Sequence, residues 1–114
     1  MTGEVICERE FNTVIDGETF PIVVRWMKPT PDHSDWRCEY SIAWPDASVR
    51  RGYAMGVDST QALILAFHPV STDLELAPWP VRWFDNEVND LGLPGFRDPE
   101  TRTRVITSRG MLRP

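Results

Sequence analysis

The stretch that decides the fold covers residues 56–67 and reads Gly-Val-Asp-Ser-Thr-Gln-Ala-Leu-Ile-Leu-Ala-Phe. Asp58 is placed to accept hydrogen bonds from the backbone N–H groups of a first helical turn, and Gln61 can reach back to the Asp58 backbone N–H. This capping box opens into an apolar run, so a helix is predicted to begin directly after Asp58. The same point ends a strand-rich N-terminal half.

The predicted helix extends well beyond its first turns. Pro69 removes one backbone hydrogen bond and clashes with the preceding turn, so the helix either ends near Phe67 or bends and continues toward Leu76. We predict a bent or two-part helix, because the apolar stripe at helical spacing continues past the proline. A band this wide needs a second cover besides a sheet, either the segment at 79–83 or a second subunit. The stripe consists of Leu63, Ala66, Phe67, Val70 and Leu74, widened by Ile64 and Leu65.

Alternation of apolar and polar residues predicts four strands before the helix. Asp16-Gly17 is a strong two-residue turn between the first two strands. Loops are expected at 29–35, where two prolines stiffen the chain, and at 45–48. The strands are predicted at residues 4–15, 19–28, 36–44 and 49–56.

The last two strands bear on how the helix packs. The strand at 36–44 alternates cleanly, as expected of a sheet with one buried and one wet face. In the next strand Gly52, Ala54 and Gly56 share one face, where small residues let a helix approach closely. The pattern alone leaves open which sheet face the helix covers. On the polar face, three arginines are expected to pair with Glu39 and its neighbours, namely Arg25, Arg37 and Arg50.

These elements predict an α+β fold: a four-stranded, mainly antiparallel sheet in meander order, packed against one long helix, with a loop-rich C-terminal region closing the far side. Residues 1–94 are expected to form a single α+β domain, followed by a basic C-terminal tail at 95–114. The domain holds fifteen acidic and seven basic residues and the tail two acidic and five basic ones, so their net charges of −8 and +3 sum to −5.

Charge and hydropathy exclude several classes of partner. An acidic body argues against nucleic acid or an anionic membrane as the main partner. The longest apolar run, residues 62–67, has six residues, whereas a bilayer-spanning helix needs about 20. The N-terminal residues lack the basic and apolar regions of a signal peptide, so a cytoplasmic protein is expected.

The sequence carries no motif for catalysis or for metal binding. Its histidines, His33 and His68, and its cysteines, Cys7 and Cys38, lack the spacing of a zinc site, and no G-x-S-x-G nucleophile motif occurs. The cysteines are expected to be small buried thiols rather than a disulfide. We therefore expect no catalytic residue, no bound metal and no cofactor.

Surface recognition is the class of function that remains. Trp79, Trp83 and Phe84 lie close together in a proline-rich, loop-rich segment, and Asp85 and Glu87 follow them. Aromatic anchors beside a charged rim are typical of a protein-binding patch. The alternative is that these rings close the open side of the helix.

Three motifs together resemble a family of small bacterial proteins of unknown function. They are Trp36-Arg37-Cys38-x-Tyr40, Gly52-Tyr53-Ala54-x-Gly56-Val57-Asp58-Ser59-x-Gln61-Ala62-Leu63, and Leu91-Gly92-Leu93-Pro94. The resemblance covers roughly residues 36–94 and implies a bacterial cytoplasmic setting, with no catalytic residues to carry over. Pro69 and the extension after Gly95 depart from the family pattern. Compact acidic bacterial proteins of this build are also similar to immunity proteins, which neutralise toxins.

Two classes of function follow as hypotheses. The first is a non-enzymatic protein–protein interaction module, immunity-like, whose acidic body speeds association with a basic partner. The second is a small-ligand-binding protein or enzyme with a pocket between the helix and the C-terminal loops, where Tyr53, Trp83 and Asp85 would converge. A homodimer formed through the helix or an edge strand is compatible with either.

Overall fold

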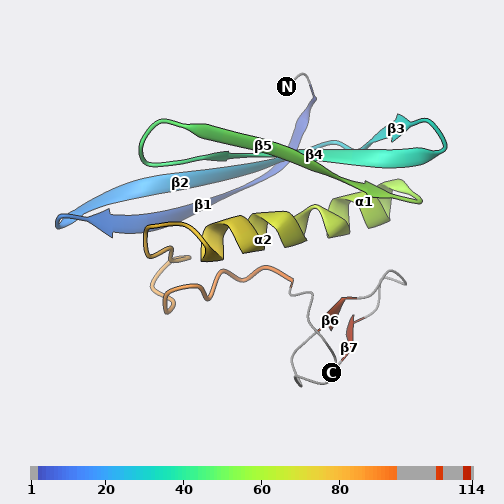
Figure 1. Cartoon of the computed structure of the whole chain (residues 1–114). Coiled ribbons are helices and arrows are strands. Elements are labelled where there is room, and N and C mark those ends of the chain that lie inside the picture. Colours follow the sequence, from blue (N-terminus) through green and yellow to red (C-terminus); the bar gives the residue numbers. More distant parts are fainter. Residues whose placement is uncertain (1–2, 95–104, 107–111, 114) are drawn as a thin grey trace.

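The computed structural model describes residues 3–94, 105–106 and 112–113. It has one open sheet with a bent helix on one face (Figure 1). The sheet contains β1 (Val5–Ile15), β2 (Glu18–Met27), β3 (Thr30–Asp32), β4 (Asp35–Ala43) and β5 (Val49–Gly56). The helical part consists of α1 (Ser59–Leu65) and α2 (Phe67–Glu75). The expected α+β class and the antiparallel pairing are therefore confirmed.

The sheet has five strands rather than the predicted four. Part of the predicted loop at 29–35 forms β3, which pairs antiparallel with the beginning of β4. β2 pairs only with the second half of β4, and β3 pairs with its beginning. β2 and β3 therefore lie one after the other along the same edge of β4. Pro31 is tolerated there because β3 is a short edge strand, where the backbone N–H that proline lacks is not needed for strand pairing.

The remaining pairings follow the predicted meander. β1 pairs with β2, β2 with β4, and β4 with β5, all antiparallel. Asp16 and Gly17 form the turn between β1 and β2 with φ angles of 51° and 81°. Positive φ at both central residues is what a two-residue hairpin turn needs, and Asp-Gly supplies it with little strain. This turn is confirmed.

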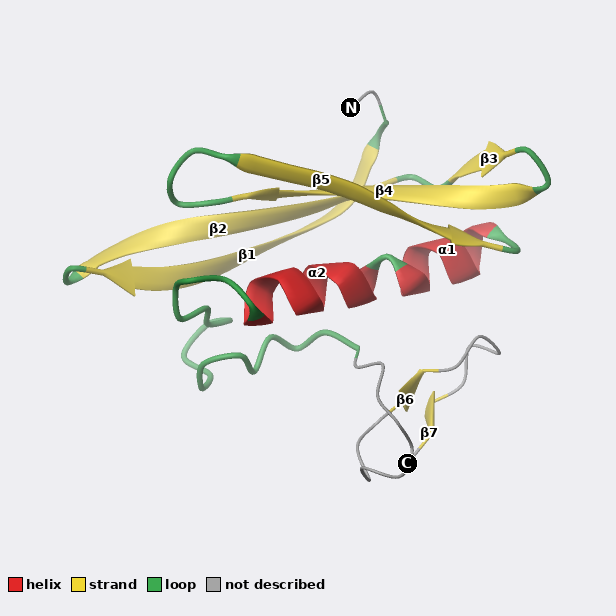
Figure 2. Ribbon diagram, in the orientation of Figure 1, coloured by secondary structure: helices red, strands yellow, loops and turns green. Residues whose placement is uncertain are grey.

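The core lies between the sheet and the helix (Figure 2). Residues of β1, β2 and β4 that point to the helix are buried, whereas their sequence neighbours are more exposed. Each large side chain removed from water there contributes about 1.5–3 kcal/mol to folding. The fully buried side chains of the sheet are Phe11, Thr13, Ile22, Val24, Cys38 and Ile42, and those of the helix are Ala62, Ala66, Val70 and Leu74.

The helix begins where the capping box predicts. The Asp58 carboxylate accepts a hydrogen bond from the Gln61 backbone N–H at 2.8 Å. The Gln61 side chain reaches one residue further back than predicted and accepts from the Val57 backbone N–H, also at 2.8 Å. Two of the backbone donors around the helix start are thus satisfied by side chains.

The predicted bend is present at Ala66, between α1 and α2. Pro69 lacks the N–H that would bond to the Leu65 carbonyl, so the helix is interrupted one turn before the proline. The Trp26 indole packs at this point: its Nε1–H donates to the Ala66 carbonyl at 3.2 Å, and its ring meets Phe67 edge-on at 4.9 Å between centroids. A buried side chain therefore binds the backbone at the residue where the two helical segments meet.

The helix covers the sheet face that carries the small residues of β5, which settles the alternative left open by the sequence. A Cβ atom added to Gly56 would overlap the backbone of Ala62, and one added to Gly52 would overlap the Tyr40 hydroxyl. The two glycines thus set how closely α1 and the Tyr40 ring approach β5. The opposite sheet face is not covered by the helix.

After α2 the chain turns back along the helix (Figure 1). Val81 and Leu91 are buried, and Ala77, Trp83 and Leu93 pack against the same core. The loop-rich C-terminal region therefore closes part of the core, as predicted. Of the predicted basic tail at 95–114, only the pairing of β6 (Val105–Ile106) with β7 (Leu112–Arg113) lies within the described residues.

Candidate functional site

The segment at 81–91, called here the 81–91 loop, is fixed at both ends. Val81 is fully buried and Leu91 is 5% exposed. The Asn89 backbone N–H donates to the Val81 carbonyl at 2.9 Å, which closes the loop on itself. Arg82 forms a two-way backbone bridge with Asn12 of β1, each bond 2.9 Å long. The loop is thus attached to the edge of the sheet.

Hydrogen bonds within the loop hold its shape. The Asn86 backbone N–H donates to the Trp83 carbonyl at 3.2 Å, and that of Asp90 donates to the Glu87 carbonyl at 3.0 Å. The Arg82 guanidinium adds a bond to the Asn86 carbonyl at 3.3 Å. Compact surface loops held together by their own contacts are a frequent location of function.

Phe84 is the exposed aromatic residue of this loop. Its side chain is 72% exposed, and its backbone has a φ of 56°. A bulky residue in the left-handed region is strained by about 1–2 kcal/mol, and such strain is concentrated at functional sites. The ring lies 5.1 Å from that of Trp83. The fold therefore holds a large apolar ring in water at a conformational cost.

Trp83 is held from two sides and supports the loop. The Arg9 guanidinium of β1 lies 3.9 Å from the centre of the indole ring, a cation–π contact. Arg9 also donates to the carbonyls of Leu91 and Gly92, at 3.1 and 3.0 Å. Gly92 has a φ of 65°, and any Cβ there would overlap the Trp83 ring. The geometry at Trp83 thus fits the alternative that this ring packs against the protein itself and is not an exposed binding anchor.

The five predicted binding residues separate into two surfaces. Trp83, Phe84, Asp85 and Glu87 lie on the 81–91 loop, where the two acidic side chains and Asp90 are exposed. Trp79 lies elsewhere and packs against Trp44 at 5.7 Å between ring centroids. Neighbours in sequence therefore do not form one patch.

The pocket that the second hypothesis placed at Tyr53, Trp83 and Asp85 is not formed. Tyr53 lies on β5, at the opposite side of the sheet order from β1, and its ring contacts Arg37 on the face away from the helix. Trp83 is bound to Arg9 of β1. A hollow lies instead where the turn between β4 and β5 meets the end of α2, and it is lined by other residues, among them Trp44, Arg50, Asp73 and Trp79.

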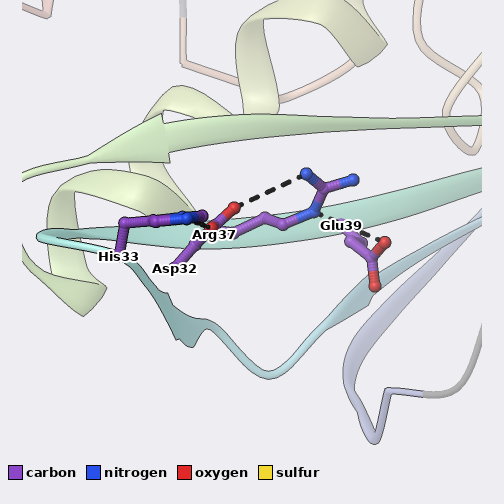
Figure 3. A network of polar contacts seen from close by, with 4 residues as sticks. All are labelled: Asp32, His33, Arg37 and Glu39. Carbon is purple, nitrogen blue, oxygen red and sulfur yellow. Dashed lines mark hydrogen bonds and ion pairs between the residues drawn. The ribbon is translucent and has the colours of Figure 1, made fainter.

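The sheet face away from the helix carries a polar network around Arg37 (Figure 3). Its guanidinium lies 3.7 Å from the Asp32 carboxylate and 3.6 Å from that of Glu39, and stacks 3.6 Å from the Tyr53 ring. Arg25 pairs with Glu8 at 2.6 Å on the same face. Partly exposed pairs of this kind contribute about 0–1 kcal/mol each. They make this face a solvated surface.

The predicted arginine pairs are confirmed only in part. Arg37 pairs with Glu39 as expected, whereas Arg25 pairs with Glu8 instead. Arg50 points to the helix side and pairs with Asp73 at 2.5 Å. Sequence reasoning missed the roles of Arg9 and Arg50. For Arg9 a signal existed, because it interrupts the inward-facing row of Cys7 and Phe11 on β1.

Cys7 and Cys38 are free thiols, as predicted, with Cys38 buried and Cys7 half-buried. Burial, with smaller contributions from the neighbouring Cys7 and Glu39, raises the pKa of Cys38 to about 11. Such a thiol is a poor nucleophile at neutral pH. Among residues 3–94 no group of three His, Cys, Asp or Glu side chains is placed to hold a metal ion.

A sequence model of one protein family, described as a domain of unknown function (DUF6968), matches residues 7–95. The chain belongs to this family. Neither a curated protein nor a solved structure matches the chain. In the described part of the DUF6968 chain, no helix has the length and apolar character needed to cross a membrane.

Proposed function

We propose that this DUF6968 protein is a non-enzymatic interaction module that binds a partner protein through the 81–91 loop. The observation that carries the proposal is the 72% exposure of Phe84 on a loop whose two ends are buried. An isolated exposed apolar residue is ordinary, but one held out by a strained backbone on a closed loop is not. A role in binding would account for an exposed ring held in this way.

The energetics of binding favour a ring presented in this way. Burying a Phe side chain at an interface yields about 1.5–3 kcal/mol. Because the hydrogen bonds within the loop already fix the backbone at Trp83 and Glu87, little ordering is left to oppose association. Phe84 would be the anchor, and the surrounding charges would form the rim.

Charge specifies the kind of partner. Asp85, Glu87 and Asp90 are exposed on the same loop as Phe84, and residues 1–94 carry a net charge of −8. Such a field accelerates association with a basic surface and disfavours an acidic one. An immunity-type role, in which the protein neutralises a basic toxin by covering its surface, is the specific form that we propose.

Phe84→Ala is the sharpest test of this function. Immobilised wild-type protein is expected to retain a partner from a lysate of the source organism, and the purified partner is then titrated calorimetrically. Removing the anchor should weaken binding by roughly 10–100-fold, which corresponds to about 1.4–2.7 kcal/mol. Val57→Ala is the matched control, because Val57 is also 72% exposed but lies outside the loop.

Three results would reject the proposal. A partner that binds Phe84→Ala as tightly as the wild-type protein uses another surface. Failure of the wild-type protein to retain any protein leaves the module without a ligand. Affinity that does not change with salt removes the role assigned to Asp85 and Glu87, because contacts between exposed charges are screened at high ionic strength.

A further inference from the structure

A hollow of about 440 Å³ lies where the turn between β4 and β5 meets the end of α2. None of its lining residues belongs to the 81–91 loop, so it is a surface separate from the proposed protein-binding site. Its size falls within the range of roughly 300–1,000 Å³ that is usual for small-molecule sites. Its lining includes Trp44, Pro78, Trp79, Arg50 and Asp73.

One side of the hollow is aromatic. The half-buried rings of Trp44 and Trp79 lie 5.7 Å apart and are tilted by 38°. Trp79 stands between Pro78 and Pro80, whose fixed φ angles restrict the backbone that carries it. Rings tilted in this way leave no parallel slot between them, so a ligand in the hollow would have to stack on the rings from outside the pair. A flat aromatic base, which is best held between two parallel rings, is poorly suited.

The other side carries one positive and one negative charge. Arg50 Nε lies 2.5 Å from Asp73 Oδ2, with the two side chains 56% and 21% exposed. The buried Tyr40 hydroxyl lies near Arg50, whose positive charge it helps to stabilise. A guanidinium has five N–H donors and a carboxylate two acceptor oxygens. The N–H groups of Arg50 and the carboxylate oxygen of Asp73 that are not used in the ion pair can still bind a ligand in the hollow. The net charge of the pair is zero.

An ion pair of zero net charge gives no net attraction for an ionic ligand. An anion such as a phosphate meets the Asp73 carboxylate, and an ammonium group meets the Arg50 guanidinium, each at close range. A neutral ligand with both hydroxyl donors and hydroxyl acceptors satisfies the two side chains together. A sugar ring has these hydroxyl groups at its edge, and it has an apolar C–H face that packs on an indole.

We propose that the hollow between β4, β5 and the end of α2 binds a neutral carbohydrate, stacked on Trp44 and Trp79 and hydrogen-bonded to Arg50 and Asp73. Because the hollow is a surface feature and not an enclosed cavity, we expect a segment of an oligosaccharide chain to be the ligand. The proposal does not depend on the 81–91 loop.

The test is saturation-transfer NMR and calorimetry on the full chain with maltotriose, cellotriose and N,N′,N″-triacetylchitotriose, all neutral, at millimolar concentration. At least one of the three is expected to bind. Arg50→Gln and Asp73→Asn should each weaken that binding by about tenfold or more, since each leaves one side of the pair without its partner. Phe84→Ala is expected to bind the sugar as the wild-type protein does, which separates this site from the protein-binding function.

Several results would overturn the inference. Absence of binding for all three sugars rejects it. Equal binding of glucose, glucosamine and glucose 6-phosphate removes the selection by charge. Unchanged affinity in Arg50→Gln, with an unchanged melting temperature, places the sugar elsewhere. Binding of an oligoproline peptide at Trp44 and Trp79 in preference to every sugar identifies the hollow as a peptide groove instead.

Discussion

Thr13 places a hydroxyl group in the apolar core between the sheet and the helix. The residue is 1% exposed, and its Oγ1 has no hydrogen-bond partner within the part of the chain that the structure describes. A buried polar group without a partner loses its water without compensation, a penalty of about 1–3 kcal/mol. Its neighbour Asn12, by contrast, has its backbone fully paired with Arg82.

Thr13→Val replaces this hydroxyl with a methyl group of similar size. We expect the free energy of unfolding to rise by roughly 1 kcal/mol, because the desolvation penalty is removed and the shape is kept. Urea unfolding followed by tryptophan fluorescence measures the change. Thr13→Ala is the control and should be less stable than Thr13→Val, since it leaves a cavity. A Thr13→Val protein that unfolds at lower urea than the wild-type protein would contradict the account.

At the scale of the element, the contact between α1 and β5 depends on one missing side chain. A Cβ on Gly56 would overlap the backbone of Ala62, which cannot move aside as a flexible side chain does. Gly56→Ala is therefore expected to push α1 away from the sheet and to lower the free energy of unfolding by about 1–3 kcal/mol. Faster amide exchange in α1 (Ser59–Leu65) would locate the damage.

Gly17→Asn serves as the comparison for this prediction. Gly17 has a φ of 81° with no atom within 4 Å of an added Cβ, and asparagine tolerates the left-handed region better than other residues. We expect a change within roughly 0.5 kcal/mol. If the two variants are equally stable, the close approach of Gly56 is not what holds α1 in place.

Local signals decided which elements were predictable. The Asp16-Gly17 turn, the cap at Asp58 and the bend caused by Pro69 all act within a few residues, and each is found where the sequence predicts it. β3 was missed because two prolines indicated a loop, whereas pairing with β4 holds the segment extended. The candidate site was less predictable. Trp83 packs against Arg9 and Trp79 packs against Trp44, and both partners are distant in sequence. No short-range pattern predicts such contacts, so the separation of the two tryptophans could not be predicted.

At the scale of the whole molecule, Cys38 reports on the integrity of the sheet. It is fully buried on β4, between β2 and β5. Its pKa of about 11 leaves roughly a thousandth of the group as thiolate at pH 8. Alkylation by iodoacetamide at pH 8 should therefore modify Cys7 slowly and Cys38 only when the whole sheet unfolds.

The sign of the pH dependence follows from the same shift. The folded chain favours the neutral Cys38 thiol, so this contribution to stability is complete below the ordinary value of 9.0 and is lost as pH rises through about 11. The rate of Cys38 modification should match the global unfolding measured with urea. Modification of Cys38 in native conditions at the rate of Cys7 would mean that β4 opens independently. In the variant Cys7→Ser, Cys38 is the remaining thiol, so its modification can be followed alone.

The two sides of the sheet differ in what a foreign strand would meet. On one side β1 is already joined to Arg82 at Asn12 and carries a bulge between Val5 and Cys7. On the other, β5 pairs only with β4 among the described strands, over its whole length. Unpaired backbone along an outer strand is a template for augmentation. If another chain extends this sheet, in assembly or in aggregation, we therefore expect it to add at β5.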